Sequence, residues 1–535
     1  MKTSASAIRG TPKTGRTTTR FGSSEPIVDT TCGTVRGVLQ EEIYTFKGVP
    51  YGADTGGANR FQPAKPIAWP GIRDALDFGH RSPQDSRESG SSFASFIDPS
   101  PMSEDCLALN IFTPSIASAG HRLPVMVYLH GGAFRGGSAG APFVNGANLA
   151  RKGVVIVSLN HRLNLFGHLY LGNADGGKYI DAGNVGMLDI VTALRWVRDN
   201  ISQFGGDPGN VTIFGQSGGG SKVAVLMAMP SAHGLFHKAI IQSSSSALRQ
   251  ATIDEAERNT YYFLAELGLD RRRLAMLHEI PAAVLVSAML SARRSAGRID
   301  NYRPVVDGRA LPCQPFEEPA VRLSSKVPLM TGWCENEQRL LFSGTPAIFQ
   351  ESASEALSDT ARVLRVSTPE AQGLMNVYHR SRPADTPGDT YCQVLGDLRY
   401  RRTVLGLAER QIQHGGSSVH VYLLKWKTPV RDGLLRSPHT LCIPFAFANI
   451  DIPGGITGSE PDRYVLQEEM SEAWVAFAHR GNPNHSSLPY WRPYSLPERS
   501  TMVFDSKTFL DTDPLPEERS AFEAYPRYVP AIGEG

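Results

Sequence analysis

Residues 211–219 read Val-Thr-Ile-Phe-Gly-Gln-Ser-Gly-Gly, an apolar run that ends in the pattern Gly-x-Ser-x-Gly around Ser217. The apolar run predicts a buried strand, and residues 222–229 have a helical composition. Ser217 is therefore expected in a tight turn from strand to helix, where flanking glycines let the hydroxyl stand clear of the backbone. The start of the helix also favours developing negative charge. The stretch predicts a nucleophilic serine, although such turns also occur in α/β sheets with a purely structural role.

A second match to the same pattern lies at Gly136–Gly140, with Ser138 at its centre. No strand directly precedes Ser138, and the surrounding loop is rich in glycine. A nucleophile of this type needs the strand-to-helix context, so Ser138 is interpreted as a loop serine and Ser217 as the predicted nucleophile.

The segments on either side of Ser217 predict the fold class. Apolar runs at 125–129 and 154–159 are typical of strands buried on both faces of a parallel sheet. From Met187 to Ile201, apolar residues recur at helical spacing. Further strands are expected at 239–242, 327–330 and 419–424, and antiparallel hairpins at 27–38 and 44–51. This alternation predicts an α/β protein with a mostly parallel central sheet flanked by helices.

The chain is expected to form one large domain after a short tail. Residues 1–25 are basic, rich in Ser, Thr and Gly, and lack the apolar stretch of a secretory signal, so they are predicted to be disordered. Residues 26–535 are predicted to be a single domain. Polar, helical segments at about 251–300 and 351–415 interrupt the strand pattern and are predicted to form cap insertions.

Bulk composition excludes several classes of protein. The net charge is only +2, with acidic and basic residues mixed along most of the chain, so neither a nucleic-acid nor a membrane-surface binder is expected. No apolar run approaches membrane-spanning length. Six scattered cysteines without metal-like spacing suggest free thiols and a cytoplasmic location. The sequence carries no signal for an oligomeric state, and none for a metal or an organic cofactor.

A run of small residues follows the strand predicted at 125–129. It reads His130-Gly131-Gly132-Ala133-Phe134, and small side chains let backbone N–H groups approach a bound oxyanion without obstruction. Gly132, Ala133 and Gly218 are the predicted oxyanion-hole donors. His130 is interpreted as a structural residue that holds the loop.

A general base and an acid should follow Ser217 in the order serine, acid, histidine. After the strand predicted at 327–330, the chain reads Gly-Trp-Cys-Glu-Asn-Glu at 332–337, so that Glu335 and Glu337 are both candidates for the acid. Of the fourteen histidines, His439 stands just before an apolar segment, whereas the others lie mostly in polar or helical contexts. Spacing alone chooses neither the carboxylate nor the histidine.

With these motifs in place, the sequence resembles the type-B carboxylesterase family, which includes the cholinesterases, and in particular its bacterial carboxylesterase and p-nitrobenzyl-esterase-like branch. The resemblance runs from about Pro26 to about Val529. Its further markers are Phe46–Tyr51, Ser103–Leu107, Asn160–Arg162, Phe204–Pro208 and Arg480–Asn484.

The resemblance implies an α/β-hydrolase fold and a Ser-His-Glu triad. The family's acid follows the pattern Gly-x-Asn-x-Asp-Glu, which places it at Glu337 and not at Glu335. The family's histidine precedes Pro-Phe-x-Phe, here Pro444–Phe447, which places it at His439. Ser243 matches a serine that supports the acid.

The chain departs from the family pattern at several of these motifs. Cys334 and Asn336 replace the usual Asn and Asp before the acid, and Cys442 stands where an acidic residue is usual. Ser82 replaces the family's cysteine partner for Cys106, so the family disulfide is expected to be absent. Gln216 replaces the glutamate that usually precedes the nucleophile, which weakens the expectation of a cationic substrate.

The resemblance implies hydrolysis of carboxylic esters through an acyl-enzyme, acting on uncharged small to medium small-molecule esters. The loop Gly131–Phe134 resembles a class associated with tolerance of bulky alcohol groups. An amidase or carbamate hydrolase with the same triad is an alternative, because pocket shape chooses the leaving group. A more distant alternative is a non-catalytic, neuroligin-like binding protein, since fold alone does not establish activity.

Overall fold

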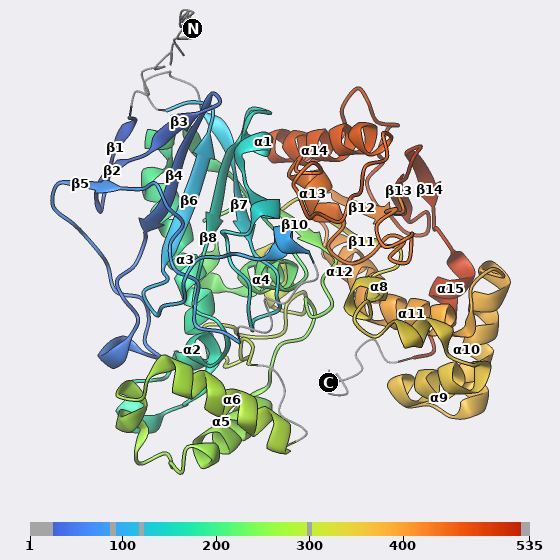
Figure 1. Ribbon diagram of the computed structural model, residues 1–535, viewed down its shortest axis with the longest axis horizontal. Coiled ribbons are helices and arrows are strands. Elements are labelled where there is room, and N and C mark those ends of the chain that lie inside the picture. Colours follow the sequence, from blue (N-terminus) through green and yellow to red (C-terminus); the bar gives the residue numbers. More distant parts are fainter. Residues whose placement is uncertain (1–24, 86–92, 117–121, 297–301, 526–535) are drawn as a thin grey trace, which may run out of the picture.

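An eleven-stranded sheet forms the centre of the molecule (Figure 1). This computed structural model describes residues 25–85, 93–116, 122–296 and 302–525. The predicted tail, residues 1–25, therefore lies outside the described residues except for its last position. The strands follow the spatial order β14 (Phe509–Thr512), β13 (Ser500–Phe504), β12 (Val419–Leu424), β11 (Leu329–Cys334), β10 (Lys238–Gln242), β9 (Gly206–Gln216), β7 (Leu123–Leu129), β8 (Val155–Leu159), β6 (Ala108–Thr113), β4 (Ile43–Pro50) and β3 (Val38–Gln40).

The middle of this sheet is parallel and its edges are antiparallel. From β13 through β12, β11, β10, β9 and β7 to β8, each neighbouring pair runs in the same direction. At one edge β14 pairs antiparallel with β13, and at the other β6, β4 and β3 do so in turn. A separate small sheet contains β1 (Ile27–Thr30), β2 (Gly33–Arg36) and β5 (Ile72–Asp74). The predicted α/β class with a mostly parallel sheet is confirmed.

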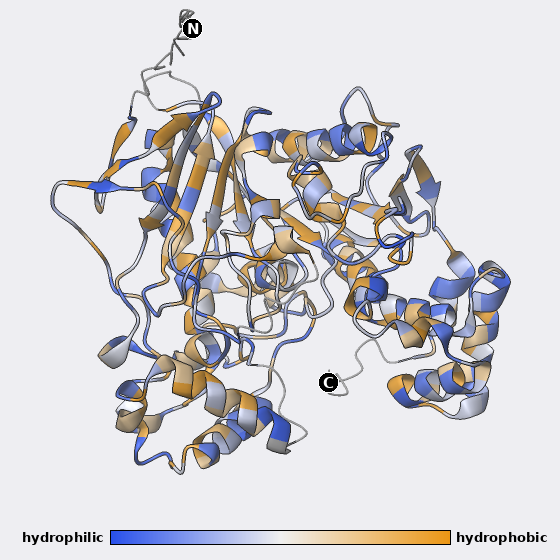
Figure 2. Ribbon diagram, in the orientation of Figure 1, coloured by the Kyte–Doolittle hydropathy of each residue, from blue (hydrophilic) through white to orange (hydrophobic). Residues whose placement is uncertain are grey.

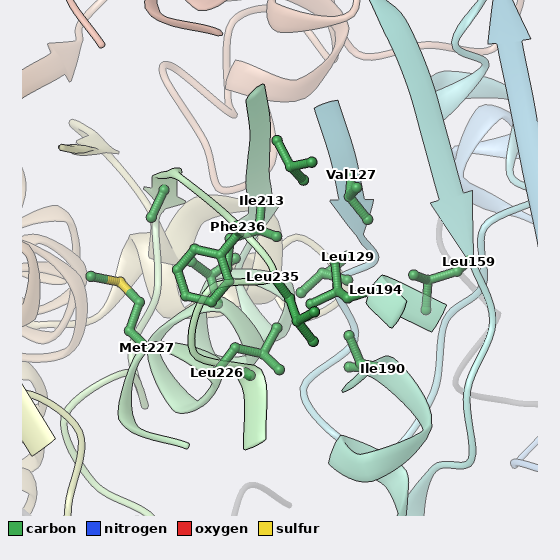
Figure 3. Packing of buried hydrophobic residues seen from close by; sticks show 14 of the residues in the cluster. Val127, Leu129, Leu159, Ile190, Leu194, Ile213, Leu226, Met227, Leu235 and Phe236 are labelled. Carbon is green, nitrogen blue, oxygen red and sulfur yellow. The ribbon is translucent and has the colours of Figure 1, made fainter. Parts of the chain in front are cut away.

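Strand alternation divides the core into two layers, one on each face of the sheet. On one face, Val125, Val127 and Leu129 of β7 pack with apolar residues of α3 (Val185–Asn200), α4 (Gly218–Ala228) and α12 (Arg402–Gln413). Figure 3 shows this layer, with Val127 and Leu129 near Leu194 of α3. On the other face, Met126 and Tyr128 pack with α1 (Ala147–Ala150), α13 (Cys442–Ala446) and α14 (Arg463–Arg480).

Two helical groups outside these layers have apolar clusters of their own. The first joins α5 (Ile253–Glu266) and α6 (Ala282–Ala296) to α2 (Asn164–His168). The second joins α9 (Ala353–Leu364), α10 (Thr368–Ser381) and α11 (Pro387–Gly396) to Phe522, which directly follows α15 (Pro516–Ala521). The two groups lie at separate corners of the view in Figure 1, and Figure 2 shows more hydrophilic residues on them than on the sheet.

These groups contain the helices of the segments at about 251–300 and 351–415, whose role as caps stays a prediction. Helix α12 falls inside the predicted second cap, yet its apolar residues Val404 and Leu407 belong to the main core against the sheet. Two short helices complete the set, α7 (Ala320–Leu323) and α8 (Gln338–Leu341). Among the described helices, none combines the length and the apolar character that a bilayer crossing requires.

Candidate active site

Ser217 lies in the turn between β9 and α4. Its backbone adopts φ 58° and ψ −123°, a conformation that non-glycine residues rarely adopt and that recurs at functional turns. The Ser217 N–H donates to the carbonyl of Gln242 in β10 at 2.8 Å, and its carbonyl accepts from the Ser221 N–H at 3.1 Å. The side chain is partly exposed, whereas Gln216 and Gly218 on either side are buried. The turn therefore presents one hydroxyl at the carboxyl end of the sheet.

The glycines of this turn are required by close backbone packing. A Cβ on Gly219 would lie 2.0 Å from the carbonyl oxygen of Leu129 in β7, and one on Gly215 would lie 2.5 Å from the carbonyl carbon of Gly219. Neither distance leaves room for a side chain. The pattern around Ser217 thus holds α4 directly against the strand that leads into the glycine-rich loop.

His439 and Glu337 are in direct contact. The Nδ1 atom of His439 lies 2.5 Å from Oε2 of Glu337, and both side chains are buried. Oε1 of Glu337 accepts from the N–H of Cys334 at 2.8 Å. Since both carboxylate oxygens are held, Glu337 fixes the ring so that Nδ1–H donates to the carboxylate and Nε2 is left as an acceptor.

Glu335, the other carboxylate of the motif, points elsewhere. It forms an ion pair with Arg382 at 3.2 Å and lies 3.9 Å from Nζ of Lys425. The two carboxylates that the residue pattern left open are therefore separated in space, with Glu337 on the histidine and Glu335 in an ionic network.

Asn336, between them, joins the acid loop to the histidine loop. Its N–H donates to the carbonyl of Ser437 at 2.8 Å, and its Oδ1 accepts from the Ser437 N–H at 3.3 Å. Its Nδ2 also donates to Gln393 of α11 at 3.0 Å. Asn336 therefore holds two loops, from the ends of β11 and β12, at a fixed separation.

Two further side chains contact His439 that the sequence did not indicate. Nε2 of Gln216 lies 3.1 Å from Nε2 of His439 and 3.4 Å from its Nδ1. The ring of Tyr400, in the π-helical turn Asp397–Arg401, lies with its centroid 4.8 Å from that of His439. No hydrogen bond joins the Ser217 hydroxyl to His439 among the described residues, so Gln216 is the polar group at the imidazole nitrogen that would receive the serine proton.

In the loop at 130–134, each of three successive backbone carbonyl groups accepts its own hydrogen bond. The carbonyl of His130 accepts from Nζ of Lys222 at 2.7 Å, and the carbonyl of Gly131 lies 2.9 Å from Nδ1 of His130. The carbonyl of Gly132 accepts from the N–H groups of Arg135 and Gly136, both at 3.1 Å.

Because the carbonyl and the N–H of one trans peptide point in opposite directions, these bonds aim the N–H groups of Gly132 and Ala133 away from their anchors. A Cβ on Gly218 would lie 2.3 Å from Cα of Ala133, so the two backbones touch beside Ser217. Within the described residues, none of the hydrogen bonds uses the N–H of Gly132, Ala133 or Gly218. The three predicted donors are thus brought together with their N–H groups unused.

His130 and Ser138 are engaged in the loop itself. His130 is buried and stacked on His161 with ring centroids 5.1 Å apart, and burial, assisted by the charge of Lys222, lowers its pKa well below the usual value. The buried hydroxyl of Ser138 donates to the carboxylate of Asp98. Neither residue contacts the Glu337–His439 pair in the hydrogen bonds described.

Ser243 lies beside Cys334, whose backbone N–H binds Glu337. Its N–H donates to the carbonyl of Gly332 at 2.8 Å, and its hydroxyl lies 3.9 Å from Sγ of Cys334. No hydrogen bond connects Ser243 to Glu337 among the described residues, so its link to the acid runs through Cys334. Across the same residues, no cluster of three or more His, Cys, Asp or Glu side chains could hold a metal ion.

Comparisons with known proteins identify the family of this chain. A model of the carboxylesterase family matches residues 24–521. Para-nitrobenzyl esterase of Bacillus subtilis is 34% identical over 502 residues, which cover 92% of this chain and 97% of that protein. Phenmedipham hydrolase of Pseudarthrobacter oxydans is 31% identical over 90% of this chain and 95% of its own length.

Solved structures give the same result. A carboxylesterase from Geobacillus stearothermophilus superimposes with a TM-score of 0.81 at 35% identity, covering 93% of this chain and 100% of that chain. A para-nitrobenzyl esterase structure does so with a TM-score of 0.79 at 31% identity, covering 93% of this chain and 99% of the other.

Proposed function

This chain belongs to the carboxylesterase family and is a carboxylic ester hydrolase, and we propose that its reaction runs through Ser217, His439 and Glu337. The observation that carries the proposal is the 2.5 Å contact between His439 and Glu337. The residue that precedes the partly exposed Ser217, Gln216, lies 3.1 Å from Nε2 of the same histidine. The arrangement supplies a nucleophile, a base and an orienting acid in that order.

In the proposed reaction, Nε2 of His439 takes the proton of Ser217 as the hydroxyl oxygen attacks the ester carbonyl. Glu337 stabilises the imidazolium that forms, while the alcohol leaves with the proton returned by His439. A water molecule then attacks the acyl-enzyme with His439 again as base, and the carboxylic acid leaves as His439 returns the proton to the Ser217 oxygen. The first proton transfer requires the Gln216 amide to move away from Nε2 of His439, so that the Ser217 hydroxyl can take its position there. Such contacts often tighten only when substrate is bound.

The N–H groups of Gly132, Ala133 and Gly218 are proposed to bind the oxyanion of the tetrahedral intermediate. Their unused N–H groups and the touching backbones of Gly218 and Ala133 support this assignment. Donors of this kind are effective because they are oriented before charge develops and need not reorganise during the reaction.

Uncharged esters are the proposed substrates, including esters of bulky alcohols. Gln216 supports this choice, because its neutral amide stands at the imidazole where a carboxylate would attract cations. We also propose that the enzyme works in the cytoplasm, since all six cysteines are free thiols.

The test is hydrolysis of p-nitrophenyl esters by the wild-type protein and by Ser217→Ala. The variant should lose at least about 10⁴-fold in kcat while keeping its thermal unfolding temperature. An organophosphate should label Ser217 alone, as read by mass spectrometry of peptides. Retained turnover in Ser217→Ala would exclude this nucleophile. Matched amides and carbamates, assayed in parallel, would show whether the ester is the preferred substrate.

A further inference from the structure

Lys222 is a buried amine behind the proposed oxyanion loop. It lies on α4, in the turn of helix after Ser217, and its side chain is fully buried. Nζ donates to the carbonyl of His130 at 2.7 Å and lies 5.7 Å from the centroid of the Phe134 ring. Among the described residues, no carboxylate lies within 4 Å of it to form an ion pair. A buried lysine without an anionic partner is unfavourable for folding, so its presence calls for a reason.

The groups that face Lys222 supply no negative charge. His130, His161 and His168 lie near enough to interact with its charge, and burial followed by the charge of Lys222 lowers the pKa of the first two well below the usual value. Burial also lowers the pKa of His168 to about 3, so that all three are neutral. Beyond them, the carboxylate of Asp189 is engaged by Arg162 at 2.6 Å. Burial lowers the pKa of Lys222 itself to about 7.

The contact of Lys222 fixes the first peptide of the loop. By holding the carbonyl of His130, Lys222 orients the peptide that joins His130 to Gly131, and the two following carbonyls are held by Nδ1 of His130 and by backbone N–H groups. Lys222 is the only charged group in this chain of anchors among the described residues. Its position therefore couples α4, which follows the nucleophile, to the loop that carries two of the three oxyanion donors.

We propose that Lys222 is a positioning residue for the oxyanion loop and that its ammonium charge is matched by the negative charge that forms on the substrate oxygen in the tetrahedral intermediate. The inference rests on the proposed function of Ser217 and deepens it. In the resting enzyme the ammonium has no anion beside it, whereas in the transition state the oxyanion appears on the other side of the loop. An interaction present only in the transition state raises kcat, not substrate affinity.

The test compares the wild-type enzyme with Lys222→Met, which keeps length and burial but removes both charge and hydrogen bond. At pH 6.5, kcat for p-nitrophenyl butyrate should fall about 10- to 100-fold, below the 10²–10³-fold typical of a direct donor, with KM changed less than about threefold. The ratio of wild-type to variant kcat should shrink between pH 6.5 and 9, because the wild-type amine loses its proton over that range. The thermal unfolding temperature should not fall.

Lys222→Gln is the second variant, with a polar but uncharged side chain, and it should lose most of the same activity. Wild-type kcat in either variant would overturn the proposal. A loss confined to KM, or a loss that does not change with pH and accompanies a lower unfolding temperature, would assign Lys222 a structural role instead. The final stoichiometry of organophosphate labelling gives the fraction of folded enzyme in each sample. Ser217→Ala, run beside them, tests the proposed nucleophile separately.

Discussion

At the scale of single residues, the site depends on which of two neighbouring carboxylates meets the histidine. Glu335 and Glu337 are two positions apart, yet one pairs with Arg382 and the other with His439. The backbone N–H of Cys334 and the Asn336–Ser437 bonds create this difference, because they turn Glu337 toward the loop that carries His439. The residue types alone could not reveal it.

Glu337→Gln and Glu335→Gln form a matched pair that tests this assignment. Glu337→Gln replaces the acceptor of the His439 Nδ1 proton with a group that can donate, so kcat should fall about 10³- to 10⁴-fold. Glu335→Gln leaves Arg382 its contact with Glu518 at 2.8 Å and should retain kcat within about threefold. Steady-state hydrolysis of a p-nitrophenyl ester measures both. Equal losses, or a larger loss in Glu335→Gln, would contradict the assignment.

Gln216 provides a second test at this scale. A carboxylate in Gln216→Glu would lie against the imidazole and stabilise its protonated form. The acid limb of the kcat/KM profile should therefore move to higher pH by roughly one unit, since the base must be neutral to accept the serine proton. The pH profile between 5 and 9 measures the shift, and an unmoved acid limb would show that residue 216 does not contact the working base.

The sequence predicted the nucleophile and the three backbone donors from local pattern. It could not predict the contacts of Gln216, Tyr400 and Lys222, because each reaches its partner through the folded chain and not through neighbouring residues. The sequence marks Gln216 only as a departure from the family pattern. Lys222 begins the segment 222–229 that is predicted to be helical, but its burial without an ion pair becomes visible only when β7 and α4 are packed together.

At the scale of elements, strand positions were predicted better than their lengths. The run at 419–424 coincides with β12, whereas β9 begins at Gly206, five residues before the apolar run that predicted it. The glycines and Pro208 of that beginning weaken any strand pattern, and pairing with β7 imposes the extended conformation. Helix α4 likewise begins at Gly218 and not at Lys222, because packing against β7 overrides the poor helical propensity of three glycines.

Two glycine-to-alanine changes in helices test this packing. Gly219→Ala would place Cβ 2.0 Å from the Leu129 carbonyl oxygen, so either α4 or β7 must move. We expect a loss of about 3 kcal/mol or more in the free energy of unfolding, together with a loss of activity. Gly373→Ala in α10 meets no atom within 4 Å and should stabilise by about 0.5–1 kcal/mol. Chemical denaturation measures both, and similar values for the two variants would refute the packing argument.

At the scale of the whole molecule, the parallel sheet brings distant segments to one edge. The nucleophile turn follows β9, the oxyanion loop follows β7, the acid follows β11, and His439 lies in the loop after β12. Carboxyl ends of parallel strands meet at the same edge of a sheet, which explains why these loops lie together. The local pattern predicted Ser217, whereas the choice of Glu337 and His439 came from the resemblance to the family. The arrangement of the two helical groups did not follow in the same way, since each packs around its own apolar cluster and α12 joins the main core.

The free energy of unfolding should depend on pH in a way that reveals the buried Lys222. Its pKa is lowered by burial from 10.5 to about 7, so between these pH values the unfolded chain binds more protons at this residue than the folded protein does. The contribution of Lys222 to stability therefore becomes more favourable as pH rises from about 7 to 10.5. Lys222→Met lacks this group, so its stability relative to wild type should be greatest at or below pH 7 and should decline toward pH 10.

Urea denaturation of both proteins at pH 6.5 and pH 9.5 measures this difference, because all other titrating groups are shared by the two chains. A pKa unit corresponds to about 1.4 kcal/mol, so the gap between the proteins should change by a few kcal/mol over this range. A gap that stays constant would mean that the folded protein holds Lys222 in the same protonation state as the unfolded chain. If Lys222→Met stabilises the fold while lowering kcat, the charge of Lys222 is retained for the reaction and not for folding.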